Sequence, residues 1–105
     1  MTCRTTLLAA AQQLKAGALP VAADSFLDAA ALCSNAGDDE KTDLAWHGVA
    51  VALEREARPA VRQARLARTR RCLAVAPPRN AALRRRVAHL VESTERTPLD
   101  GRVRS

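Results

Sequence analysis

Apolar side chains recur at helical spacing along most of the chain, and short polar or glycine-containing breaks separate the runs. The first run places Leu7, Ala11 and Leu14 at positions i, i+4 and i+7, which is the spacing of one helix face. Gly17 then ends the helix, and a second alanine-rich run follows. This pattern predicts a first antiparallel helical hairpin over residues 5–34.

A second hairpin is predicted over residues 39–75. Its first helix carries Trp46, Val49 and Leu53 on one stripe and begins with a run of acidic residues, which suits the positive end of a helix. Its second helix is expected to continue without interruption over about residues 60–75. Two consecutive prolines then mark its end.

A capping helix is predicted over residues 80–94, where Leu83 and Val87 begin an apolar stripe behind an asparagine that suits an N-cap. The segment 95–105 lacks this periodicity and contains a proline and a glycine, so a disordered tail is expected there. Together the runs indicate a single all-α domain over residues 1–94, with about five helices arranged as antiparallel hairpins.

The first hairpin carries three small residues, Gly17, Ala22 and Ala29, spaced around the aromatic Phe26. This part of the chain resembles the tetratricopeptide repeat (TPR). In that family, small residues and an aromatic residue at fixed spacing let two antiparallel helices pack closely. The segment from Trp46 to Leu53 is similar to the first-helix pattern of the same family. The resemblance implies a TPR-like helical repeat; a generic five-helix bundle is the alternative, because alanine-rich helices produce such spacings by chance. The residues at the family's spacing are Gly17, Ala22, Phe26 and Ala29.

The resemblance also implies where a partner would bind. In such repeats the first helix of each hairpin lines a concave groove that receives a helical or extended peptide segment of another protein. Small bacterial secretion chaperones resemble this plan, so the expected function is a non-enzymatic protein–protein interaction module, an adaptor or a small chaperone. The groove positions carried over from the family pattern are Leu7, Ala11, Leu14, Lys15, Leu44, His47, Val51, Glu54 and Arg55.

Charge is distributed unevenly along the chain, whose net charge is +6. Residues 1–57 hold four basic and eight acidic side chains, whereas residues 58–105 hold thirteen arginines and three acidic side chains. The acidic half of one copy could therefore dock on the basic half of another, as self-association. The alternative function is a basic helical nucleic-acid-binding or regulatory protein, because arginine binds phosphate bidentately; a solvated surface is the third interpretation. The candidate basic patch consists of Arg62, Arg65, Arg68, Arg70, Arg71, Arg84, Arg85 and Arg86.

Catalytic and metal chemistry are not expected. His47 and His89 lie far apart in sequence, no glycine-rich phosphate loop is present, and no closely spaced cysteine or histidine pair suggests a metal site or a cofactor. Cys33 and Cys72 fall on helix stripes and are expected to be small core residues. Three widely separated cysteines favour a reducing compartment over a disulfide framework, and no apolar run approaches the ~20 residues of a membrane span. We therefore expect a cytoplasmic protein.

Overall fold

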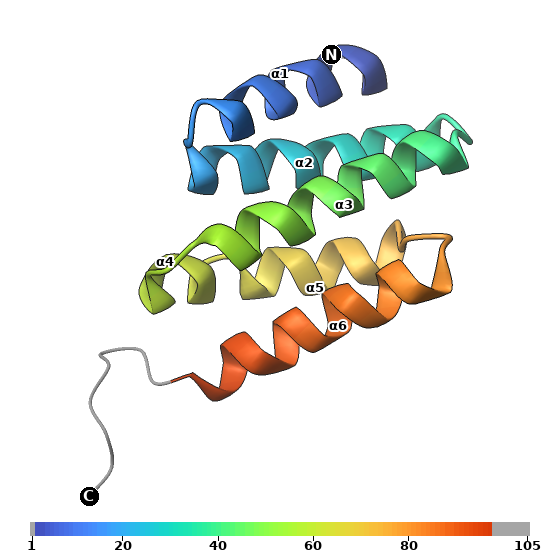
Figure 1. The fold of residues 1–105 in the computed structure, drawn as a ribbon. Helices are drawn as coiled ribbons and strands as arrows, with labels where there is room; N and C mark the ends of the chain where they lie inside the picture. The colour runs from blue at the N-terminus through green and yellow to red at the C-terminus, as the bar shows by residue number, and fades with distance from the viewer. Residues whose placement is uncertain (1, 98–105) are drawn as a thin grey trace, which may run out of the picture.

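The computed structural model describes residues 2–97. This part of the chain contains helices and no strand, so the all-α prediction is confirmed (Figure 1). Residues 98–105, which include most of the tail expected to be disordered, lie outside the described residues. The helices are α1 (Cys3–Lys15), α2 (Leu19–Asn35), α3 (Asp39–Arg55), α4 (Pro59–Gln63), α5 (Leu66–Val75) and α6 (Ala81–Arg96).

Side-chain caps and two glycines fix the helix ends. Thr2 forms a capping box with Thr5 at the start of α1, and the Asp38 carboxylate accepts a hydrogen bond from the backbone N–H of Lys41 in the first turn of α3. Gly17 and Gly37 follow α1 and α2 with φ values of 80° and 73°, a conformation that glycine adopts without a Cβ penalty. The predicted breaks are thus real and have local causes.

The helices form two rows. α1, α3 and α6 lie in one row, since α3 contacts both α1 and α6, whereas α2 and α5 contact each other in the second row. α2 also packs closely against α1 and α3, and Figure 1 shows the helices as a stack that begins with α1 and ends with α6. One face of the stack is therefore built from α1, α3 and α6.

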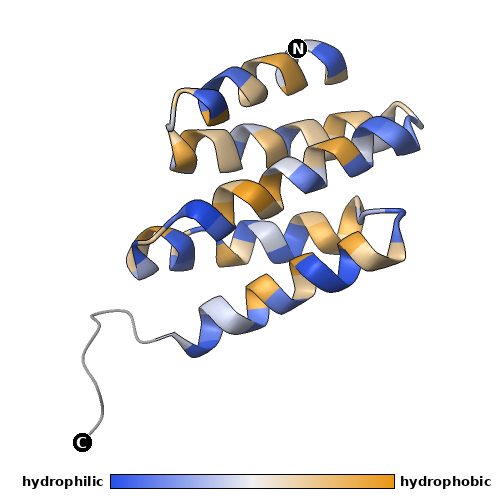
Figure 2. Ribbon diagram, viewed as in Figure 1, coloured by the Kyte–Doolittle hydropathy of each residue, from blue (hydrophilic) through white to orange (hydrophobic). Residues whose placement is uncertain are grey.

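The core is alanine-rich and centred on α2 and α3. Trp46 is fully buried, and its indole Nε1 donates a hydrogen bond of 2.6 Å to the carbonyl oxygen of Ala76, which follows α5. Figure 2 shows that apolar residues predominate on α2, whereas polar residues are frequent along α6. The buried alanines are Ala10, Ala22, Ala23, Ala29, Ala30, Ala45, Ala50, Ala52 and Ala76.

The uninterrupted helix expected over residues 60–75 is wrong, because the chain turns between α4 and α5. In a continuous helix the backbone N–H of Arg65 would bond the carbonyl of Val61. Instead that N–H donates to Arg62, and the Arg65 guanidinium donates to the Val61 carbonyl at 3.0 Å while also reaching Asp24 on α2. The contact between Arg65 and Asp24 on α2 thus occurs at the point where the helix is interrupted. At the other end of the chain, α6 continues to Arg96, beyond the predicted residue 94.

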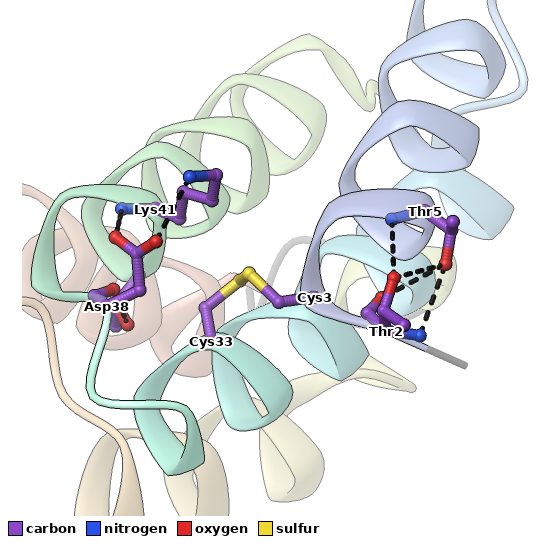
Figure 3. The surroundings of a disulfide bond; sticks show 7 residues. Thr2, Cys3, Thr5, Cys33, Asp38 and Lys41 are labelled. Carbon is purple, nitrogen blue, oxygen red and sulfur yellow. Dashed lines mark hydrogen bonds and ion pairs between the residues drawn. A yellow bond between two sulfur atoms is a disulfide. The ribbon is translucent and has the colours of Figure 1, made fainter.

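The cysteine prediction is also wrong in part. Cys3 and Cys33 form a disulfide that joins the start of α1 to the end of α2, with their Cα atoms 4.8 Å apart (Figure 3). An antiparallel hairpin brings these two ends together although 30 residues separate them in sequence. Cys72 remains a free, buried thiol, as expected of a core residue. Because two of the three cysteines form a disulfide, their odd number and wide separation no longer favour a reducing compartment.

Candidate binding groove

An apolar groove of about 440 Å³ lies between α1 and α3. Leucine side chains form both of its walls, the ring of Phe26 from α2 lies beneath it, and basic side chains stand at its rim. We call this feature the α1–α3 groove. It is lined by Arg4, Leu7, Leu8, Ala11, Leu14, Phe26, Lys41, Leu44, His47 and Gly48.

Two leucines leave the groove apolar and open to solvent. Leu8 is 56% exposed and Leu44 is 55% exposed, although each is a large apolar side chain in a well-formed helix. Leu7 and Leu14 are half-buried and pack against the core below. Exposed apolar residues that gather in one concave patch are typical of an interaction site, whereas isolated ones are ordinary. Here four leucines share one patch.

Gly48 makes room for the floor of this groove. A Cβ atom at Gly48 would lie 2.4 Å from the Cδ1 atom of Phe26, well inside van der Waals contact. Glycine within a helix costs about 1 kcal/mol relative to alanine, so its presence in α3 calls for a packing reason. The close approach of the Phe26 ring supplies that reason. Sequence reasoning missed Gly48, although a glycine in the middle of a predicted helix was a usable signal.

The rim of the groove carries positive charge. Lys41 pairs with Asp38 at 3.0 Å, and the backbone N–H and ammonium of Lys41 hold the pKa of the Asp38 carboxyl below its usual value. Within residues 2–97, no ion pair neutralises Arg4. A groove with one uncompensated guanidinium at its edge suits an apolar ligand with an acidic group beside its apolar face.

A second cleft, of about 710 Å³, adjoins the groove between α3 and α6. Leu44 and His47 line both features, so they form the ridge between them. The second cleft is more polar than the first. Its other lining residues are Glu40, Asp43, Asn80, Ala82, Leu83 and Arg86.

The structure brings together five of the nine predicted groove residues. They are Leu7, Ala11, Leu14, Leu44 and His47, and all of them line the α1–α3 groove. The other four lie at the C-terminal ends of the helices or on other faces. Lys15 and Arg55 are exposed at the last turns of α1 and α3, Val51 is half-buried, and Glu54 pairs with Arg86 on α6.

Several lining residues were absent from the predicted groove. Arg4, Leu8, Lys41 and Gly48 complete the walls and rim, and Phe26 forms the floor rather than filling only the gap inside the first hairpin. The groove runs along α1 as far as Leu14, but on α3 it ends at Gly48, near the middle of the helix, whereas the prediction extended to the last turn of α3. The helix α1 begins at Cys3, before the predicted residue 5, so its first turn includes Arg4.

The predicted basic patch is largely engaged within the chain. Arg65 pairs with Asp24 at 3.2 Å, Arg68 pairs with Asp28, and Arg70 pairs with Glu95. These contacts join α5 to α2 and to α6. The acidic half and the basic half predicted to meet across two copies thus meet in one molecule.

The other predicted arginines have varied partners. Arg86 binds Glu54 through two hydrogen bonds of 2.6 and 2.8 Å. The side chain of Arg62 donates to Thr94, and that of Arg84 donates to two backbone carbonyls. Arg71 and Arg85 are exposed, and no ion pair engages either of them within residues 2–97.

Hydrogen bonding fixes the charge of the Glu54–Arg86 pair. The Arg86 guanidinium holds the pKa of the Glu54 carboxyl below its usual value of 4.5, and Glu54 raises the pKa of Arg86 in turn. Arg86 also lies 3.2 Å from Nδ1 of His47, at the ridge of the groove. Arg86 therefore connects α6 to His47, one of the two residues that line both clefts.

The described residues hold no group of three or more histidine, cysteine or acidic side chains placed to bind a metal ion. None of the helices described is both long enough and apolar enough to cross a membrane. The chain matches no protein-family model, and searches of curated proteins and of solved structures return no match.

Proposed function

We propose that the protein is a non-enzymatic protein–protein interaction module that holds an apolar segment of another protein in the α1–α3 groove. One observation carries the proposal: Leu8 and Leu44 are more than half exposed above the Phe26 ring, in a groove with leucine walls and a basic rim. Covering these side chains would remove apolar surface from water at about 25 cal/mol per Å². The proposed role is that of an adaptor or a small chaperone.

An amphipathic helix suits this groove as its occupant. The α1 wall runs from Leu7 to Leu14, and the seven steps between these residues correspond to roughly 10 Å along the helix axis, or about two turns of a bound helix. A ligand helix with apolar residues at i, i+3 or i+4, and i+7 would meet both walls. An acidic residue next to that stripe would face Arg4. An extended segment with alternate apolar side chains is the second form of the same ligand.

The arrangement of the helices supports a TPR-like repeat as the basis of this function. α1, α3 and α6 form one row, and α2 and α5 form the other, so the first helix of each hairpin contributes to one shared face. The α1–α3 groove lies on that face. In this proposal α6 is the capping helix of the stack.

The disulfide changes the compartment that we propose. Disulfides persist in oxidising environments and are rare in the cytosol, where thiols are kept reduced. The Cys3–Cys33 bond therefore supports an oxidising compartment as the working place of this protein, in preference to the cytoplasm expected from the number of cysteines.

Substitutions that introduce a charge into the groove test the proposed function. Leu8→Glu and Leu44→Glu place a carboxylate in the apolar wall without emptying the core, because both side chains are exposed. Val75→Glu is the matched control, since Val75 is 76% exposed and lies outside the groove. The partner is first identified by crosslinking in the source cells, and its binding segment is then titrated against purified protein by calorimetry.

We expect each leucine variant to weaken binding at least tenfold, about 1.4 kcal/mol, and the valine control to bind as the wild type does. Equal binding by the leucine variants and the wild type would refute the groove. The substitutions Arg71→Ala and Arg85→Ala test the alternative function, which is binding of nucleic acid. If these two substitutions abolish binding of nucleic acid and the leucine variants leave it intact, the basic surface is the functional site.

A further inference from the structure

The α1 helix forms one wall of the groove, and although it packs closely against α2, it buries few side chains. Its fully buried side chains are Thr6 and Ala10, both small, whereas α2 contributes seven buried residues and α3 contributes eight. The main packing partners of α1 are α2 and α3. No ion pair joins α1 to another helix within residues 2–97.

The two ends of α1 are held in different ways. Its C-terminal end is tied to α2 by the short turn around Gly17, in which backbone N–H groups bond back to the last turn of the helix. Its N-terminal end is joined to α2 by the Cys3–Cys33 disulfide, next to the Thr2–Thr5 capping box (Figure 3). The disulfide is therefore a covalent link between the first turn of α1 and the last turns of α2.

This covalent bond adjoins the binding surface. Cys3 directly precedes Arg4 at the rim and lies one helical turn before Leu7 in the wall. Releasing the first turn of α1 would displace these side chains from Leu44 and Lys41 on the opposite wall. The disulfide therefore lies at the end of the helix that carries this wall.

We propose that the Cys3–Cys33 disulfide is a redox latch: when it is intact α1 closes the groove wall, and when a dithiol reduces it α1 detaches locally and the groove loses its shape. The consequence for binding rests on the proposed function, whereas the detachment of α1 does not. The latch makes partner binding dependent on the thiol–disulfide state of the compartment.

The reduction is a balanced thiol–disulfide exchange. One thiolate of the dithiol attacks the sulfur of Cys3, which is half-buried, whereas Cys33 is fully buried. The S–S bond breaks, a mixed disulfide forms at Cys3, and Cys33 leaves as a thiolate that takes up a proton. The second thiol of the reagent then displaces Cys3. Two electrons and two protons reach the protein, and the dithiol becomes a cyclic disulfide.

The remaining cysteine does not compete in this exchange. Cys72 is buried, its thiol lies 3.9 Å from the Leu27 carbonyl oxygen, and burial raises the pKa of that thiol. A thiol with a raised pKa forms little thiolate and reacts slowly. Cys72→Ser is therefore a suitable control, because it removes a thiol without touching the latch.

Hydrogen exchange of the full chain tests the latch. Backbone amides are followed in the oxidised protein, after reduction with dithiothreitol, and in the double variant Cys3→Ser with Cys33→Ser. We expect the amides of α1 to exchange at least about tenfold faster in both forms that lack the disulfide, while the exchange of α3 and α6 is unchanged, because one segment can open without unfolding of the whole domain. Cys72→Ser should exchange as the wild type does.

Two results would overturn the latch. Equal protection of α1 in the oxidised and reduced proteins would show that packing alone holds the helix. Faster exchange in α1, α3 and α6 together would show that the bond supports the whole domain and is no local device. Because this measurement needs no partner, its failure leaves the groove proposal standing, and loss of the groove proposal leaves the exchange result unaffected.

Discussion

The two ends of the helical stack are held together by different chemistry. The first hairpin, α1 and α2, relies on close contacts between small residues and on one disulfide. The second part, α4 to α6, is attached to the first through arginine–carboxylate pairs and through the Trp46 hydrogen bond to Ala76. The disulfide holds two residues of neighbouring helices together at one point. The ion pairs are spread along the helices and favour one relative position of α5 and α6 against α2 and α3.

The comparison explains the charge asymmetry of the sequence. The acidic first half supplies Asp24, Asp28 and Glu54, and the basic second half supplies the arginines that pair with them. Partly exposed pairs of this kind each stabilise a protein by only about 0–1 kcal/mol. Their main effect is to favour one docking arrangement of the helices over others. Part of the charge segregation along this chain is therefore paired within one molecule.

Truncation of Trp46 should produce the largest loss of stability, because this side chain connects α3 to the segment that follows α5. Trp46→Ala empties a fully buried site and leaves the Ala76 carbonyl without its indole donor. We expect the free energy of unfolding to fall by about 3–5 kcal/mol in urea denaturation. Trp46→Phe is the control; it keeps most of the ring and should lose clearly less. Similar losses for both variants would assign the effect to the hydrogen bond alone.

Gly48→Ala should have an intermediate effect at the contact between α2 and α3. The added methyl group meets the Phe26 ring at 2.4 Å, so the ring must move, which costs about 1–3 kcal/mol of unfolding free energy. The double variant Gly48→Ala with Phe26→Leu should recover part of this loss, because leucine leaves room for the methyl group. If Gly48→Ala stabilises the protein, the ring is not confined as described.

The Glu54–Arg86 pair should give the smallest effect, and it depends on pH. A double-mutant cycle with Glu54→Ala and Arg86→Ala should yield a coupling of about 0.2–1 kcal/mol at neutral pH, since both side chains are more than a third exposed. The pKa of Glu54 is lowered in the folded state, so this contribution is present above 4.5 and is lost as the pH falls through the folded-state pKa.

Arg85→Ala provides the matched control for that cycle. Arg85 is exposed and adjacent in sequence, and within the described residues it joins no ion pair. Its removal should leave the unfolding free energy and its pH dependence unchanged. A coupling that persists at about pH 2 would show that the interaction does not depend on the ionised carboxylate.

The amino-acid sequence by itself determined the helices and most of their ends. Apolar spacing, Gly17 after α1 and the capping residue Asn80 act over distances of three or four residues, and they are found where the pattern predicted them. Five groove residues were predicted in another way, from the resemblance to the TPR pattern, and they line the α1–α3 groove.

Only the tertiary structure decided which distant residues meet. The disulfide between Cys3 and Cys33, the turn at Arg65 that divides α4 from α5, and the fit of Phe26 against Gly48 all join positions that are 20 or more residues apart. No local pattern encodes such pairs, because side-chain contacts between helices depend on how the helices are offset and rotated against each other. That packing determined the floor and rim of the groove and turned the predicted basic patch into a set of internal ion pairs.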